Sequence, residues 1–335
     1  MIFVTYRKIF LSIAVLVVAC SIGIIAMLGL NLGIDFTGGS LTEVSYEQRP
    51  DKEILSGELD QLGLGSYSLR ETQDDEGRDG FILRTRDLTE DERLTVSTVV
   101  TAEGQDAAVT RFTSIGPVIG QELKDKAVWA IVAVSLVIIL YVAFAFAGVS
   151  YPVGSWVYGG ITILALLHDV LVPAAVMALL GYYVGVEADV LFIMALLAVL
   201  GYSVNDTIVV FDRVRENLVK FRQEKKIKVV GTDGLEREEI EYILTKPFPA
   251  IVGESVSQTL MRSINTSVTT LVALIALYFI GGEVTQTFSL VLIAGVLAGT
   301  YSSICIANPL LVFVAERKME KEYGPEVKNE SKKDK

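Results

Sequence analysis

The sequence predicts a polytopic α-helical membrane protein with six membrane spans and one folded domain outside the membrane. Three observations predict this class. Hydrophobic residues make up 51% of the 335 residues, with a mean hydropathy of +0.49. They gather in six runs, each close to the length of about 20 residues that a helix needs to cross a bilayer core. Between the first two runs, over residues 31–125, the pattern changes to short amphipathic elements.

One span is predicted before the folded domain and five after it. They cover residues 9–30, 127–146, 156–184, 190–211, 263–280 and 288–314. The first run is longer than the roughly 7 to 15 apolar residues of a secretory signal, so we expect a retained anchor. The other segments are an N-terminal stretch at 1–8, a loop at 212–262 and a tail at 315–335.

The distribution of Lys and Arg predicts the orientation in the membrane, because short basic loops stay on the cytoplasmic side. Residues 1–8 contain two basic residues, residues 212–249 contain nine, and the tail from Glu316 contains seven. The short loops on the opposite side contain only acidic charges, at Glu187, Asp189 and Glu283. We therefore expect an inner-membrane protein with both termini cytoplasmic and residues 31–125 in the periplasm.

The folded domain at 31–125 is strongly acidic. It contains 20 Asp and Glu against nine Lys and Arg, a net charge of −11 that equals the charge of the whole chain. Nucleic-acid binding requires a basic patch and is not expected. Both cysteines, Cys20 and Cys305, lie inside predicted spans, so no disulfide is expected in this domain.

The pattern within the folded domain predicts the order β-α-β-β-α-β. Alternating residues predict strands at 41–47, 66–72, 80–86 and 107–115, and helical spacing predicts a helix over 51–62. Thr89 followed by Glu92 predicts a capping box at the start of a second helix. This order is typical of a ferredoxin-like domain. It contains no metal-ligand spacing and no nucleophile beside a base, so we expect no enzymatic activity, cofactor or metal.

Five motifs occur in order along the chain. They are GIDFTGGS at 33–40, SIGPVIGQEL at 114–123, VNDTIVVFDRVREN at 204–217, QTLMRSINTSVTTL at 258–271 and GTYSSICIANPLL at 299–311. Together they resemble the SecF branch of the SecD/SecF family of protein-export membrane proteins, from about Tyr6 to Val314. One segment, at about 221–255, is longer than the family pattern, and its role is left open.

The resemblance implies a subunit of the Sec translocase that, with SecD, uses the proton motive force to promote preprotein export after ATP-driven translocation. The implied partners are SecD as a heterodimer, the SecYEG translocon, YajC, YidC and unfolded secreted polypeptide. The six spans would form half of a pseudo-symmetric unit of the resistance-nodulation-division type. Two alternatives stay open: half of a small-molecule efflux transporter, and a non-conducting assembly scaffold. The coupling ion, H⁺ or Na⁺, also stays open.

Ionisable residues inside predicted spans are the candidate coupling site. They are His168 and Asp169 in the third span, Asp206 beside Asn205 in the fourth, and Arg262 at the start of the fifth. Counted from the outer helix ends, the charged residues lie roughly 24 to 27 Å deep, in one layer. An Asp beside an Arg keeps its charge, whereas a lone Asp takes up a proton more readily. The resemblance implies proton passage at Asp206 and Arg262; the alternative is a static buried pair that sets helix register.

Two groups of small residues are predicted to be structural. The motif after the first span comprises Gly33, Asp35, Phe36, Thr37, Gly38 and Gly39. Its two adjacent glycines predict a hinge between the membrane part and the folded domain, and no Lys-Ser/Thr follows to make a phosphate loop. Gly295 and Gly299 form a small-xxx-small pattern that predicts close helix packing.

Overall fold

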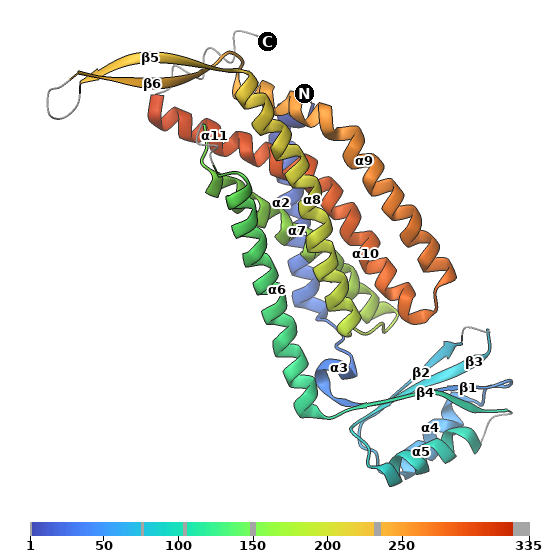
Figure 1. Cartoon of the computed structure of the whole chain (residues 1–335). Coiled ribbons are helices and arrows are strands. Elements are labelled where there is room, and N and C mark those ends of the chain that lie inside the picture. The colour runs from blue at the N-terminus through green and yellow to red at the C-terminus, as the bar shows by residue number, and fades with distance from the viewer. Residues whose placement is uncertain (1, 75–76, 103–105, 148–151, 231–235, 324–335) are drawn as a thin grey trace.

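The structure is a computed structural model that describes residues 2–74, 77–102, 106–147, 152–230 and 236–323. Figure 1 shows a bundle of long helices with a small unit of strands and helices at one end. We call the unit from Gly39 to Ile115 the sheet domain, and the long helices the bundle. At the end of the bundle away from the sheet domain, Arg7 and Glu316 form an ion pair of 2.6 Å.

In the described part of the chain, six helical segments are long and apolar enough to cross a membrane, as predicted. The first five are α2 (Arg7–Leu28), α6 (Pro117–Ala145), α7 (Ser155–Tyr183), α8 (Val190–Lys220) and α9 (Phe248–Ile280). The sixth comprises α10 (Glu283–Ser302), the π-helix η1 (Ser303–Ala307) and α11 (Asn308–Tyr323). A short α1 (Ile2–Thr5) precedes them. Several helices extend beyond the apolar runs, because polar residues continue them past the hydrophobic stretch.

The helices of the bundle approach closely where side chains are small. A Cβ atom on Gly299 of α10 would lie 2.9 Å from the Cβ of Ser203 on α8. One on Gly295 would collide with the side chain of Val199, also on α8. Real Cβ atoms do not approach so closely, so both positions require glycine at this separation of α8 and α10.

The sheet domain contains its elements in the predicted order. Its strands are β1 (Gly39–Ser45), β2 (Ser68–Gln73), β3 (Asp79–Thr85) and β4 (Ala108–Ile115), and its helices are α4 (Lys52–Gln61) and α5 (Glu90–Ala102). The sheet is antiparallel with the order β2-β3-β1-β4. Helices α4 and α5 cover one face, and the other face is turned toward the bundle (Figure 1). Buried residues such as Leu55, Leu59 and Phe81 form the core between sheet and helices.

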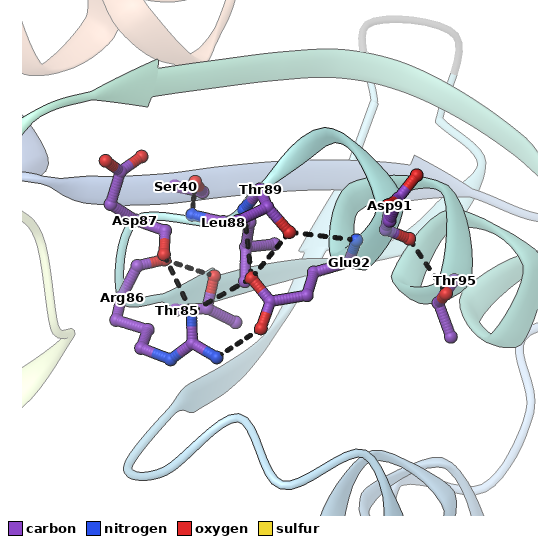
Figure 2. Close-up of polar contacts among 9 residues, drawn as sticks. All are labelled: Ser40, Thr85, Arg86, Asp87, Leu88, Thr89, Asp91, Glu92 and Thr95. Carbon is purple, nitrogen blue, oxygen red and sulfur yellow. Dashed lines mark hydrogen bonds and ion pairs between the residues drawn. The ribbon is translucent and has the colours of Figure 1, made fainter.

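The predicted capping box at the start of α5 is confirmed. The backbone N of Thr89 donates to Oε2 of Glu92 over 2.9 Å, and the backbone N of Glu92 donates to Oγ1 of Thr89 over 3.4 Å. Figure 2 shows the Glu92 carboxylate between these groups and the guanidinium of Arg86. Hydrogen bonds from Arg86 and then from Thr89 lower the pKa of Glu92 to about 2.

The segment that is longer than the family pattern contains a two-stranded hairpin. Strands β5 (Arg222–Val230) and β6 (Glu236–Leu244) pair antiparallel between α8 and α9. The hairpin extends from the end of the bundle opposite the sheet domain (Figure 1). The predicted loop at 212–262 is therefore largely regular structure, because α8 continues to Lys220 and α9 already begins at Phe248.

Candidate coupling site

Asp169 of α7 connects three helices of the bundle through its carboxylate. Its side chain is completely buried. The Oδ2 atom accepts hydrogen bonds from the hydroxyl of Ser302 at the end of α10, over 2.8 Å, and from the hydroxyl of Ser203 on α8. The Oδ1 atom lies 2.9 Å from Nδ1 of His168. Helices α7, α8 and α10 therefore meet at one ionisable group.

These contacts explain how a carboxylate is accommodated inside an apolar bundle. Burying a charge is costly unless donors compensate it, and two hydroxyls with an imidazole do so for Asp169. Protonation would turn an acceptor-only group into one that carries a donor. It would also remove the negative charge that strengthens the hydrogen bonds from the two hydroxyls. His168 is also buried, and its Nε2 has no hydrogen-bond partner among the described residues. Asp169 and His168 therefore form the ionisable pair at which α7, α8 and α10 meet.

Asp206 lies one turn from Ser203 on α8 and is also buried. Its Oδ2 has no hydrogen-bond partner in the part of the chain that the structure describes. The side chains of Asn205 and Arg262 lie at the surface of the bundle instead. Arg262 acts on Asp206 electrostatically, but within the described ranges no ion pair of 4.0 Å or less joins them. The structure thus places Asp206 near Arg262 without the direct contact that a static pair requires.

The π-helix lies next to the Asp169 contacts. Residues Ser303–Ala307 follow Ser302 directly, and all five are buried. Nδ2 of Asn308 donates to the backbone oxygen of Ser303 over 2.6 Å and satisfies a carbonyl there. Such π-bulges interrupt helices at functional sites more often than elsewhere. Sequence reasoning missed Ser203 and Ser302; the only signal was the presence of hydroxyl residues within apolar spans.

The motif after the first span forms the junction between the bundle and the sheet domain. Residues Ile34–Thr37 form the short helix α3. The backbone N of Gly33 donates to Ala188 over 2.8 Å, and Oδ2 of Asp35 accepts from the backbone N of Val190 over 2.9 Å. Phe36 is buried. This motif therefore contacts the loop between α7 and α8, which no sequence pattern indicated.

Gly38 and Gly39 lie where the chain enters the sheet domain, with φ angles of +73° and +123°. A Cβ on Gly38 would lie 2.8 Å from the Cα of Pro117, and one on Gly39 would lie 2.5 Å from the oxygen of Thr85. Both the backbone conformation and the close contacts require glycine. Backbone conformation and close packing thus explain why these two positions are glycine. That they act as a hinge stays a prediction.

These features define a class: a multi-pass membrane protein with buried ionisable groups in its helices and a folded unit attached to the bundle. The family described as "Protein export membrane protein SecD/SecF, C-terminal" matches residues 95–236 and 228–317, and "SecD/SecF GG Motif" matches residues 23–48. The chain belongs to the SecD/SecF family.

Full-length relatives support this assignment. Protein translocase subunit SecF of Thermobaculum terrenum is 36% identical over 317 residues, which cover 92% of both chains. The SecF of Pseudomonas aeruginosa is 34% identical and covers 93% of this chain and 90% of its own length. Similarity thus extends through both the bundle and the sheet domain.

A solved structure has the same arrangement. The crystal structure of SecDF from Thermus thermophilus, described as a translocon-associated membrane protein, has a TM-score of 0.76 and 31% identity over 95% of this chain. This chain spans 38% of that longer protein. A second SecDF structure, in a super-membrane-facing form, has a TM-score of 0.63 over 96% of this chain.

Proposed function

We propose that this chain is the SecF-type subunit of a Sec protein translocase and that, with SecD, it uses the proton motive force to promote preprotein export. The observation that carries the proposal is the buried Asp169 carboxylate, which binds α8 and α10 at once. Proton uptake there would weaken the charge-assisted hydrogen bonds that join α7 to α8 and α10, and in this way a proton gradient can drive movement. The chain acts as a transport subunit without catalytic residues of its own.

Within this proposal, Asp206 is the group that exchanges protons with the transmembrane path. Its Oδ2 lacks a hydrogen-bond partner among the described residues, so the charged form is poorly compensated. Arg262 acts on Asp206 electrostatically from the bundle surface, and movement of α9 would change that influence. Asp169 with His168 responds through Ser203, which lies one turn from Asp206 on α8 and bonds to Asp169. A membrane carboxylate of SecD would complete the path.

The surface formed by α8 and α9 supports SecD as the partner. Asn205 of α8 and Arg262, Asn265 and Thr269 of α9 are exposed on the bundle. Lipid is a poor environment for such groups, which normally face protein or water within a membrane. A second six-span half that covers α8 and α9 would bury them. SecYEG, YajC and YidC remain further proposed partners from family resemblance.

The proposal also orients the molecule. The basic residues of the described segments 2–8, 212–230, 236–249 and 316–323 lie on the side of the hairpin, and the sheet domain lies at the other end (Figure 1). The termini are then cytoplasmic in the inner membrane. The sheet domain, with a strand order typical of ferredoxin-like domains, is extracytoplasmic and handles unfolded secreted polypeptide.

The test uses vesicles that contain the complete translocase with this chain and its SecD partner. Asp206→Asn and Asp169→Asn keep the side-chain shape but remove the carboxyl group. Both are expected to abolish proton uptake and gradient-dependent export, whereas Asp212→Asn, an exposed change on the same helix, leaves both intact. Unaltered uptake and export in both site variants would contradict the proposal.

The same vesicles separate the two alternative functions. A non-conducting scaffold would promote export equally well after an uncoupler dissipates the gradient. An efflux transporter would expel small apolar molecules under a gradient without any effect on preprotein export. We expect export to depend on the gradient and efflux to be absent.

A further inference from the structure

The loop between α7 and α8 is bound directly by the segment that leads into the sheet domain. Leu32 and Ala188 form a parallel β-bridge. The backbone N of Ala188 donates to Asn31 over 2.7 Å, and Nδ2 of Asn31 donates to the oxygens of Gly185 and Val186 over 3.2 and 3.4 Å. Three hydrogen bonds and one β-bridge thus join this loop to the segment that follows α2.

Two arginines of the sheet domain also bind this loop. Arg84 of β3 donates from Nη1 to Oε1 of Glu187 over 2.9 Å. Its Nη2 donates to the oxygen of Leu32 over 2.8 Å and to Oγ1 of Thr37 over 2.7 Å. Arg70 of β2 donates to the backbone oxygen of Gly185. One guanidinium therefore connects the sheet, the loop and the family motif.

The Arg84–Glu187 pair is more protected than a typical surface ion pair. The two side chains are only 20% and 21% exposed, and Nη2 of Arg84 bonds to two further acceptors, the oxygen of Leu32 and Oγ1 of Thr37. Partly buried pairs are screened less by salt than exposed ones. Breaking such a pair leaves an uncompensated charge, so its loss is costly.

The loop is the common end of the two helices that hold the candidate coupling site. Helix α7 carries Asp169 and ends before the loop, and α8 carries Ser203 and Asp206 and begins after it. Asp35 of the junction caps the first residue of α8. The coupling site is therefore connected to the sheet domain through α7 and α8, the loop between them, and the hydrogen bonds of that loop with Arg84 and Arg70.

The sheet domain has two covalent attachments to the bundle, at Gly38–Gly39 and at Ile115–Pro117. A body held at two points can still rotate about the line that joins them. The contacts of Arg84 and Arg70 with residues 185–187 provide a third attachment, which removes this rotation.

We propose that Arg84 and Glu187 form a clamp that makes the sheet domain move as one body with the α7–α8 hairpin. They are positioning residues that transmit changes at the coupling site to the side where polypeptide is exported. This inference rests on the proposed function and deepens it. While the clamp is closed, the sheet domain cannot rotate about Gly38 and Gly39 independently of the bundle.

The first test compares proton uptake and export in the same vesicles. Arg84→Ala and Glu187→Arg are expected to keep proton uptake but to reduce gradient-dependent export by about fivefold or more, the lower end of typical coupling between linked sites. The double variant Arg84→Glu with Glu187→Arg is expected to recover much of the export. Arg49→Ala is the matched control, because it breaks a 2.8 Å ion pair with Glu71 that lies within the sheet domain. Wild-type export in the two clamp variants overturns the proposal.

A cross-link distinguishes a permanent clamp from one that must open. In a background with Cys20→Ser and Cys305→Ser, the variant Arg84→Cys with Glu187→Cys lacks the ion pair and is expected to export poorly. A short bis-maleimide that joins the two cysteines is expected to restore export. If the cross-link instead abolishes the residual export, the domain must pivot at Gly38–Gly39 and the proposal is wrong.

The outcomes also separate this inference from the proposed function. If Asp206→Asn abolishes proton uptake while Arg84→Ala changes nothing, only the clamp fails. If Asp206→Asn and Asp169→Asn both leave uptake and export intact, the proposed function fails, whatever the clamp variants do.

Discussion

Oδ2 of Asp35 accepts a 2.9 Å hydrogen bond from the backbone N of Val190, the first residue of α8. This carboxylate thus caps a helix that begins 155 residues later. Asp189, the N-cap residue directly before α8, caps the same helix, because its Oδ1 accepts from the backbone N of Phe192 over 2.9 Å. A residue of the motif after the first span therefore helps to set where the helix of Asp206 begins.

Loss of this cap should destabilise the start of α8. Asp35→Ala is expected to cost about 0.5 to 2 kcal/mol, the usual range for an N-terminal cap. Amide hydrogen exchange should accelerate in the first turn of α8. The control is Asp51→Ala, which removes the cap of α4 at Glu53 and should leave exchange in α8 unchanged. Equal exchange in α8 for both variants would contradict the assigned role of Asp35.

Removal of a donor from Asp169 should destabilise the bundle. Ser302→Ala leaves the buried carboxylate with one hydroxyl fewer, at an expected cost of about 1 to 3 kcal/mol. Thermal unfolding in nanodiscs measures the change. Ser257→Ala is the control, because within the described ranges that hydroxyl bonds only to the backbone oxygen of Gly253, one turn earlier on its own helix. A loss no greater than in the control would show that Ser302 does not compensate the charge.

A methyl group on Gly299 should separate α10 from α8. The added Cβ would lie 2.9 Å from that of Ser203, whose hydroxyl binds Asp169. Overpacking of this kind typically costs about 1 to 3 kcal/mol. Gly160→Ala is the control, since nothing lies within 4 Å of its added Cβ, and it should be neutral or slightly stabilising. Equal melting temperatures for the two variants would refute this account of the packing.

The clamp should depend on pH through Glu187. Burial raises the pKa of Glu187 above its ordinary 4.5, against the opposing effects of Arg84 and Arg70. The folded state then holds a proton where the unfolded state has lost it, so stability falls as pH rises from about 4.5 through the raised pKa. Glu187→Gln should flatten this dependence. A residual slope of the same sign is expected from Asp189, whose pKa burial also raises.

Glu92 should behave in the opposite way. Its pKa is lowered to about 2, mainly by the hydrogen bond from Arg86. The stability that it contributes is present above its ordinary value of 4.5 and is lost as pH falls from 4.5 toward 2. Glu92→Gln should remove this acid-side loss, as measured by unfolding between pH 2 and 5. Identical acid profiles for variant and wild type would argue against the capping box as a source of stability.

Local patterns were sufficient for the elements. Long apolar runs predicted the six spans, and alternating or helical spacing predicted the order β-α-β-β-α-β of the sheet domain. The capping box from Thr89 to Glu92 was also readable, because its two residues lie three apart and contact each other in any helix. Helix ends were less predictable, since polar residues extend α8 and α9 beyond their apolar parts.

The sequence by itself determined the membrane class, the element order and the choice of Asp169 and Asp206 as candidate groups, because hydropathy and spacing act over short stretches. Only the tertiary structure decided their partners. Ser302 lies 133 residues from Asp169, and Glu187 lies 103 residues from Arg84. Such contacts depend on which helix faces pack together and on where glycines allow close approach, and no local pattern contains that information.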